Sequence, residues 1–238
     1  MKGLALALGL ALGSGCASYT ALSAEDRGVL ERDLGRPEPA YLRLSYFVTP
    51  FFGDGSKKYL TALPPEEVRV LESPDGHVIP PGPVERVLPA GTRVHIQNIA
   101  FPTSYEVTTR IAFTPRTQTW VYLTLDGQSL DTQPYVLVLR SGSKTRAEFL
   151  AELDLELVRE DPSVKFAQYP DAVREAIRTK RAMVDMPADA LEPTWGYPEH
   201  KDISYLESSR REVWTYPGGK RKAWVTDGRV TKLEGAGA

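Results

Sequence analysis

The sequence predicts an α+β protein with a β-rich N-terminal domain, a small barrel (SH3-like or a sandwich), and a C-terminal domain of two helices and a three-stranded antiparallel meander. Between residues 41 and 139, apolar and polar residues alternate with a period of two, and turn residues interrupt them often. After residue 169, two segments with helical spacing precede three short alternating segments. The predicted segments are a signal peptide at residues 1–15, a tether with a short helix at 16–36, the β-rich domain at 37–142, a connecting helix at 143–168, the α+β domain at 169–234 and a disordered tail at 235–238.

The chain begins with the residue order of a secretory signal. Lys2 supplies a positive charge, residues 4–12 are an unbroken Leu/Ala/Gly run, and Gly13, Ser14 and Gly15 are small. The run is too short to cross a membrane as a helix, since a span needs roughly 20 residues. We therefore expect this segment to direct export and to be removed.

Cys16, the only cysteine, follows these small residues directly. This arrangement resembles the lipobox of bacterial lipoproteins. The resemblance implies that the Cys16 thiol is acylated and becomes the first residue of the mature chain. Since Ala17 and not Asp follows, it also implies a periplasm-facing anchor in the outer membrane. Ordinary secretion with cleavage nearby, or an uncleaved cytoplasmic chain, are the alternatives.

The composition is that of an ordinary globular protein, with 25% charged and 42% hydrophobic residues among 238. A formal net charge of −2 gives no electrostatic reason to expect a nucleic-acid partner. With Cys16 acylated, no thiol remains for a disulfide or a cysteine metal site. Burial of apolar surface must therefore provide the stability.

The tether is expected to contain one helix. Ser23 can cap it with Asp26 reaching back, Leu30 and Leu34 belong to an apolar stripe, and Gly35 ends it. The β-rich domain is expected to contain six strands, at residues 41–48, 67–71, 92–99, 107–113, 119–125 and 135–139.

Residues 145–160 are compatible with two structures. Thr145 and Glu148 form a capping box, and apolar residues follow on one helical face. Residues 152–157 nevertheless alternate strictly, as a strand would. The cap and the length favour the helix.

In the last domain, we expect a helix from Asp171 to Lys180 and a shorter one after Pro187, which Pro193 must end or distort. The three strands are predicted at residues 211–216, 222–226 and 229–233. Asp227-Gly228 is a two-residue hairpin turn of the strongest kind.

Four segments of this domain occur in the order seen in SmpA/OmlA (BamE-like) domains: residues 182–186, 195–198, 212–216 and 225–230. The resemblance covers residues 170–234. It implies a periplasm-facing interaction module without catalytic residues or cofactors. Apart from the lipobox, the first 165 residues resemble no family.

One candidate partner-binding set consists of aromatic residues and a neighbouring cation in this domain. Core and hairpin packing is the simpler interpretation, and an exposed patch that anchors a protein, a glycan or a phosphate-rich lipid surface is the alternative. The set is Trp195, Tyr197, Trp214, Tyr216, Trp224 and Arg221.

Catalytic and metal motifs are weak. Ser141 and Lys144 match the Ser-x-x-Lys pair of penicillin-binding proteins, but the companion motifs are absent. His77, His95 and His200 show no metal-ligand spacing. We therefore expect an outer-membrane-anchored, non-catalytic binding or scaffold protein of the cell envelope, with outer-membrane protein assembly as a candidate process. An envelope module that binds peptidoglycan or another glycan is the alternative, and a Ser-Lys hydrolase is a remote one.

Overall fold

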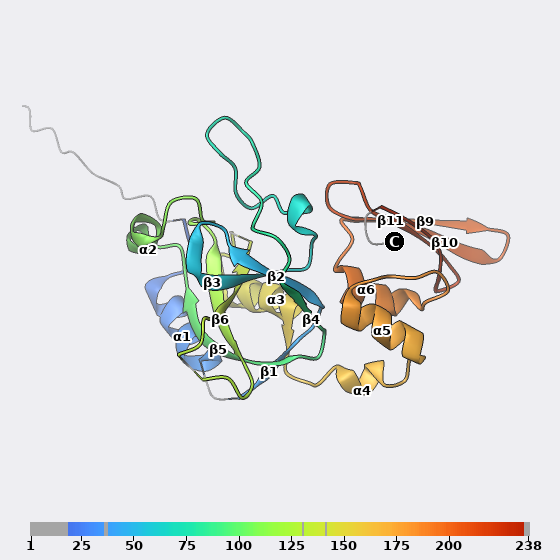
Figure 1. Cartoon of the computed structure of the whole chain (residues 1–238), viewed down its shortest axis with the longest axis horizontal. Coiled ribbons are helices and arrows are strands. Elements are labelled where there is room, and N and C mark those ends of the chain that lie inside the picture. The colour runs from blue at the N-terminus through green and yellow to red at the C-terminus, as the bar shows by residue number, and fades with distance from the viewer. Residues whose placement is uncertain (1–18, 36–37, 130, 141, 236–238) are drawn as a thin grey trace, which may run out of the picture.

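The structure, a computed structural model, describes residues 19–35, 38–129, 131–140 and 142–235. These residues form two units side by side, one built on an eight-stranded sheet and the other on a four-stranded sheet (Figure 1). The fold is therefore α+β, as predicted. The signal peptide, Cys16 and residues 236–238 of the predicted tail lie outside the described residues.

The first unit contains the eight-stranded sheet, three α-helices and a short 3-10 helix. In chain order its elements are α1 (Ala24–Leu34), β1 (Ala40–Leu42), β2 (Tyr46–Phe51), β3 (Asp54–Thr61), η1 (Pro65–Glu67), β4 (Arg86–Leu88), β5 (Arg93–Ala100), α2 (Ser104–Thr109), β6 (Thr119–Leu125), β7 (Tyr135–Leu139), α3 (Arg146–Glu156) and β8 (Leu157–Val158).

The eight strands of this unit form one open sheet, and the predicted small barrel, SH3-like or a sandwich, is therefore wrong. Its strand order is β4-β2-β3-β7-β6-β5-β1-β8, and all neighbouring strands are antiparallel except β3 and β7. Closure would require β4 to pair with β8, but these edge strands have only three and two residues. The β4 edge instead contacts a helix of the second unit, α5 (Asp171–Thr179), which protects it from pairing with another strand.

Two predicted strands are absent. Of residues 67–71, Glu67 ends η1 and the rest form no strand, and Val68 is buried against the sheet. Residues 107–113 contain the end of α2 and the turn after it, because the Thr103 hydroxyl accepts a hydrogen bond from the Glu106 amide and starts a helix. Two strands were not predicted: β3, which begins inside the apparent Gly53–Gly55 turn, and β4. The single strand predicted at 41–48 is instead divided between β1 and β2.

Both faces of the large sheet are covered by apolar residues. On one face, α1 and α3 pack through Leu30, Leu34, Phe149 and Leu153 into the main core. On the other, residues after β3, including Val68, cover a second cluster. The helix of the predicted tether is therefore part of the folded unit.

The predicted helix caps are confirmed. Ser23 Oγ accepts from the Asp26 amide at the start of α1, and Thr145 Oγ1 accepts from the Glu148 amide at the start of α3. The favoured helix is confirmed as α3, and of the alternating segment 152–157 only Leu157 belongs to a strand, because α3 continues to Glu156 and the two-residue β8 follows at once.

The second unit continues with α4 (Ser163–Phe166), α5, η2 (Ala188–Ala190), α6 (Leu191–Trp195), β9 (His200–Leu206), β10 (Ser209–Thr215), β11 (Lys222–Thr226) and β12 (Arg229–Glu234). The helices cover one face of an antiparallel sheet of order β12-β11-β10-β9. The predicted three-stranded meander thus gains a fourth strand, β9, whose residues are all exposed. Asp227 and Gly228 both have positive φ, as a two-residue hairpin turn requires.

Within the described residues, no helix is long and apolar enough to cross a membrane.

Candidate functional site

The two units are joined by hydrogen bonds around Ser45, which is fully buried between β1 and β2. Its hydroxyl donates to the Ile177 carbonyl at 2.6 Å and accepts from the Ala90 amide at 2.9 Å. Its backbone amide donates to the Pro193 carbonyl at 2.8 Å. One residue of the first unit therefore satisfies polar groups on both α5 and α6.

Lys180 adds a buried amine to this junction. It is 5% exposed, and its Nζ donates to the carbonyls of Ser45 at 2.6 Å and Thr194 at 2.9 Å. Burial lowers the pKa of Lys180 to about 7, and the charge of Arg221 lowers it further. The charge of Glu156 in the first unit opposes this lowering. Burial raises the pKa of the Glu156 carboxyl, which accepts a hydrogen bond from the Tyr46 hydroxyl.

A buried ion pair is the third connection between the units. Arg221 Nε and Glu67 Oε2 are 3.0 Å apart, and their side chains are 2% and 3% exposed. The guanidinium lies 5.2 Å from the ring centre of Trp195 and 4.9 Å from that of Tyr216. Glu67 belongs to the connection between β3 and β4, residues 62–85. The buried ion pair holds this connection against the second sheet, because separating the two charges would leave each one buried without a partner.

A groove of about 700 Å³ opens at the junction, between the β1–β2 turn, the α3–α4 connection and α6. Leu44, Pro193, Phe166 and Tyr197 supply its apolar surface. The Tyr197 hydroxyl donates to the Leu155 carbonyl at 3.1 Å, which fixes the ring at the groove wall.

The groove is lined by charges of both signs. They are Arg43, Arg159 and Lys165, and Asp154, Glu160, Asp161, Asp189 and Glu192. Lys165 pairs with Asp189 at 2.9 Å, and Glu192 pairs with Lys201 at 2.8 Å. Arg159 and Glu160 are exposed and make no ion pair with any described residue. Arg43, Asp154 and Asp161 also make no ion pair with any described residue, so the groove offers free charges of both signs, which suits a polypeptide with mixed charge.

The structure separates the six residues of the candidate aromatic set. Trp195, Trp214, Tyr216 and Arg221 are buried in the second core, so they do not form an exposed patch. The physical reason is that α5 and α6 cover this face of the sheet. Trp224 is half-buried on the opposite face, where Lys232 Nζ lies 4.2 Å from its ring centre. Tyr197 alone lines the groove.

The weaker motifs are also dispersed. Lys144 is exposed, and its amide donates to the Glu148 carboxylate at 2.7 Å; Ser141 lies outside the described residues. His77 and His95 contact Asp75 and Asp126 in separate surface pairs. No group of three or more potential metal ligands occurs in the described part of the chain.

The sequence reasoning missed the residues that form the junction and groove: Ser45, Glu67, Arg159 and Lys180. Only Lys180 carries a local signal, because it ends α5 in the left-handed conformation beside a buried helical stripe. The others lie far apart in sequence and meet only in the folded chain.

Comparisons with protein families, with curated proteins and with solved structures found no match. The resemblances to the lipobox and to SmpA/OmlA domains therefore remain predictions from the sequence.

Proposed function

We propose that this protein is a lipid-anchored binding or scaffold protein of the bacterial cell envelope, attached to the outer membrane through Cys16 and acting without catalysis. The observation that carries the binding role is the mixed-charge groove at the junction of the two units. A role in outer-membrane protein assembly is the finer form of this proposal, and it rests on the resemblance of residues 170–234 alone.

The groove favours a protein ligand. Its unpaired Arg159 and Glu160 are adjacent and of opposite sign, and Val164 at its edge is 70% exposed. A polypeptide segment can place a carboxylate, a cation and an apolar side chain over these three residues. A neutral glycan has no charged groups to pair with them.

The anchor is tested by comparing the wild type with the Cys16→Ala variant. We expect the wild type in the outer-membrane fraction, with the mass of the attached acyl chains at Cys16, and the variant in the soluble periplasmic fraction. Equal distribution of the two proteins would contradict the anchor.

The groove is tested by photo-crosslinking in intact cells. A photoreactive amino acid replaces Val164 at the groove edge or, as a control, Val184, which is 45% exposed and outside the groove. We expect a discrete protein adduct from position 164 only, reduced by Arg159→Glu. Absence of an adduct, together with sedimentation of the protein with purified cell-wall sacculi, would favour the glycan-binding alternative.

A further inference from the structure

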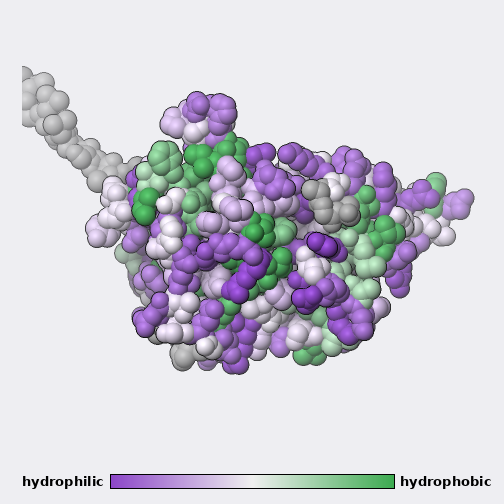
Figure 2. Space-filling model, in the orientation of Figure 1, coloured by the Kyte–Doolittle hydropathy of each residue, from purple (hydrophilic) through white to green (hydrophobic). Residues whose placement is uncertain are grey.

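The segment from Thr103 to Gln118 displays large apolar side chains to solvent. Tyr105 on α2 is 73% exposed, and Ile111 and Phe113 in the turn after it are 51% and 63% exposed. In Figure 2, hydrophobic surface lies beside α2, at the end of the molecule opposite the β9–β10 hairpin (Figure 1). Exposed Ile and Phe in one short turn need an explanation, since solvent exposure of such side chains is unfavourable.

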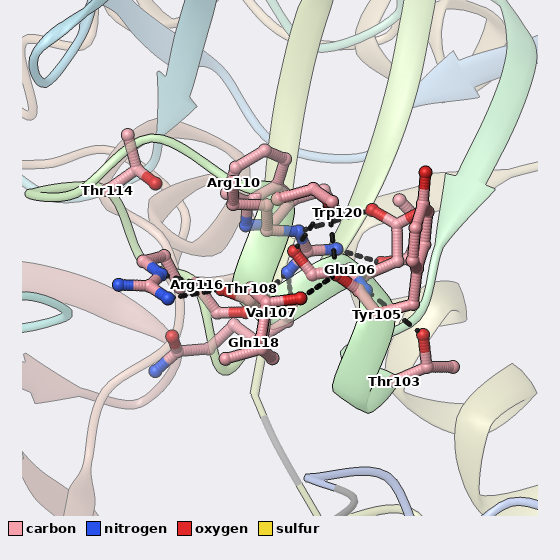
Figure 3. A network of polar contacts seen from close by, with 12 residues as sticks. Thr103, Tyr105, Glu106, Val107, Thr108, Arg110, Thr114, Arg116, Gln118 and Trp120 are labelled. Carbon is pink, nitrogen blue, oxygen red and sulfur yellow. Dashed lines mark hydrogen bonds and ion pairs between the residues drawn. The ribbon is translucent and has the colours of Figure 1, made fainter.

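This segment is held rigidly by a buried cation (Figure 3). The Arg110 side chain is 3% exposed, and its Nη1 donates to the carbonyls of Arg116 at 2.6 Å and Gln118 at 2.7 Å, while Nη2 donates to the Ala100 carbonyl at 2.7 Å. Its guanidinium carbon lies 3.9 Å from the ring centre of Trp120.

Further bonds close the turn. Arg116 Nε donates to the Val107 carbonyl at 2.8 Å, and the buried Thr114 hydroxyl donates to the Ile111 carbonyl at 2.7 Å. Phe113 itself has φ 64°, a conformation that a bulky residue rarely adopts and that surrounding contacts must enforce. These hydrogen bonds therefore fix the turn in a conformation that leaves its apolar side chains exposed to solvent.

The first described residue, Tyr19, lies beside the segment from Thr103 to Gln118. The Tyr19 amide donates to the Pro102 carbonyl at 3.2 Å, directly before the Thr103 cap, and Tyr19 is itself 49% exposed. Cys16 precedes Tyr19 by three residues, and three residues span at most about 11 Å. An acylated Cys16 would therefore hold this end of the molecule close to the bilayer.

We propose that Tyr105, Ile111 and Phe113 form a membrane-contact surface that enters the lipid bilayer carrying the acyl chains of Cys16. This inference rests on the proposed anchor and deepens it, because it fixes the orientation of the protein. With α2 against the lipid, the second unit and its exposed β9 point away from the membrane (Figure 1). Tyrosine, whose ring is apolar and whose hydroxyl is polar, suits the interface between lipid and water.

The test uses the acylated protein in vesicles of phosphatidylethanolamine and phosphatidylglycerol. Since Cys16 is blocked by acylation, Phe113→Cys can be labelled selectively with an environment-sensitive fluorophore. The matched control is Tyr205→Cys on β9, since Tyr205 is 71% exposed at the opposite end. Lipids brominated in their acyl chains should quench the label at position 113 and leave the label at 205 unchanged. Equal quenching at both positions, or none at 113, would overturn the proposal.

A second measurement titrates unacylated Cys16→Ala protein with a large excess of the same vesicles, so that binding too weak to retain the protein in a membrane fraction is still measured. Replacing Ile111 and Phe113 with serine should weaken vesicle binding about tenfold or more, because each side chain loses its transfer into lipid. The matched control replaces Ile203 and Tyr205 with serine and should bind as the parent does.

If the acylated protein sediments with vesicles while position 113 is not quenched, the orientation is wrong and the anchor stands. If Cys16 carries no acyl chain, the anchor itself fails.

Discussion

At the scale of single residues, the distinctive feature is the concentration of buried charge where the two units meet. Lys180, Glu67 and Arg221 are each at most 5% exposed. Buried charges are costly unless they are paired and hydrogen-bonded, so each one restricts the arrangements in which the units can dock. These residues make the junction specific, while the apolar cores on either side supply most of the stability.

Lys180 should make stability depend on pH. Its pKa is about 7 in the folded protein and near 10.5 in the unfolded chain. Between these values the unfolded chain binds the additional proton, so the free energy of unfolding should rise with pH, by up to roughly 4 kcal/mol across the window. Urea unfolding between about pH 7.5 and 9.5 should show this slope in the wild type.

The Lys180→Met variant is the control, since methionine has a similar length and does not titrate. Its free energy of unfolding should be flat over the same interval. An equal slope in both proteins would assign the dependence to another group.

The Glu67→Gln variant should lose much of its stability. It leaves Arg221 buried without its partner, which typically costs about 3–5 kcal/mol. The matched control is Glu234→Gln, because Lys232 and Glu234 are 3.8 Å apart and both more than half exposed. That variant should stay within about 0.5 kcal/mol of wild type. If urea denaturation showed similar losses of unfolding free energy in the two variants, burial would not be what makes the Glu67–Arg221 pair important for stability.

At the scale of elements, caps and turns predicted the structure better than period-two alternation did. Ser23, Thr145 and Asp227-Gly228 act locally, so their geometry follows from a few neighbouring residues. Alternation misassigned residues 107–113, although Thr103 and Glu106 have the spacing of a capping box and would have indicated α2. The strands β4 and β9 were missed because short or exposed strands depend on their partners for stability, and β3 was missed because it begins inside the apparent Gly53–Gly55 turn.

The Gly228→Ala variant tests the hairpin turn between β11 and β12. Gly228 has φ 78°, where an L-residue with a Cβ is strained, so the substitution should lower the free energy of unfolding by about 1–2 kcal/mol. Gly55 in β3 has open space around it and an ordinary φ, so Gly55→Ala should be neutral or slightly stabilising. Thermal denaturation of the two variants provides the comparison, and a larger loss in Gly55→Ala would contradict the turn assignment.

At the scale of the whole molecule, the two units behave as one body in this fold. Ser45 connects the first sheet to α5 and α6, and helix α5 covers the β4 edge. Each unit therefore completes the polar and apolar contacts of the other. The groove exists only because of this docking, since its walls come from both units.

We therefore expect a single cooperative unfolding transition for the whole chain, with equal calorimetric and van't Hoff enthalpies. Ser45→Ala, which leaves the Ala90 amide without this partner and the Ile177 carbonyl with only the long bond from the Lys180 amide at 3.4 Å, should lower stability by about 1–3 kcal/mol. Amide hydrogen exchange should accelerate in both units alike. Two separate transitions, or faster exchange in only one unit, would show that the units are independent.

The sequence by itself determined the α+β class, the caps of α1 and α3, the strands β6 and β7, the helix α5 and the hairpin at Asp227-Gly228. It also indicates the anchor at Cys16. All of these depend on interactions between residues close together in the chain. Only the tertiary structure decided that the large sheet is open, that the aromatic set is mostly core, and that Ser45, Glu67 and Lys180 meet residues more than a hundred positions away. The physical reason is that burial and charge pairing are properties of the packed chain, and no local pattern records which distant segment will cover a given side chain.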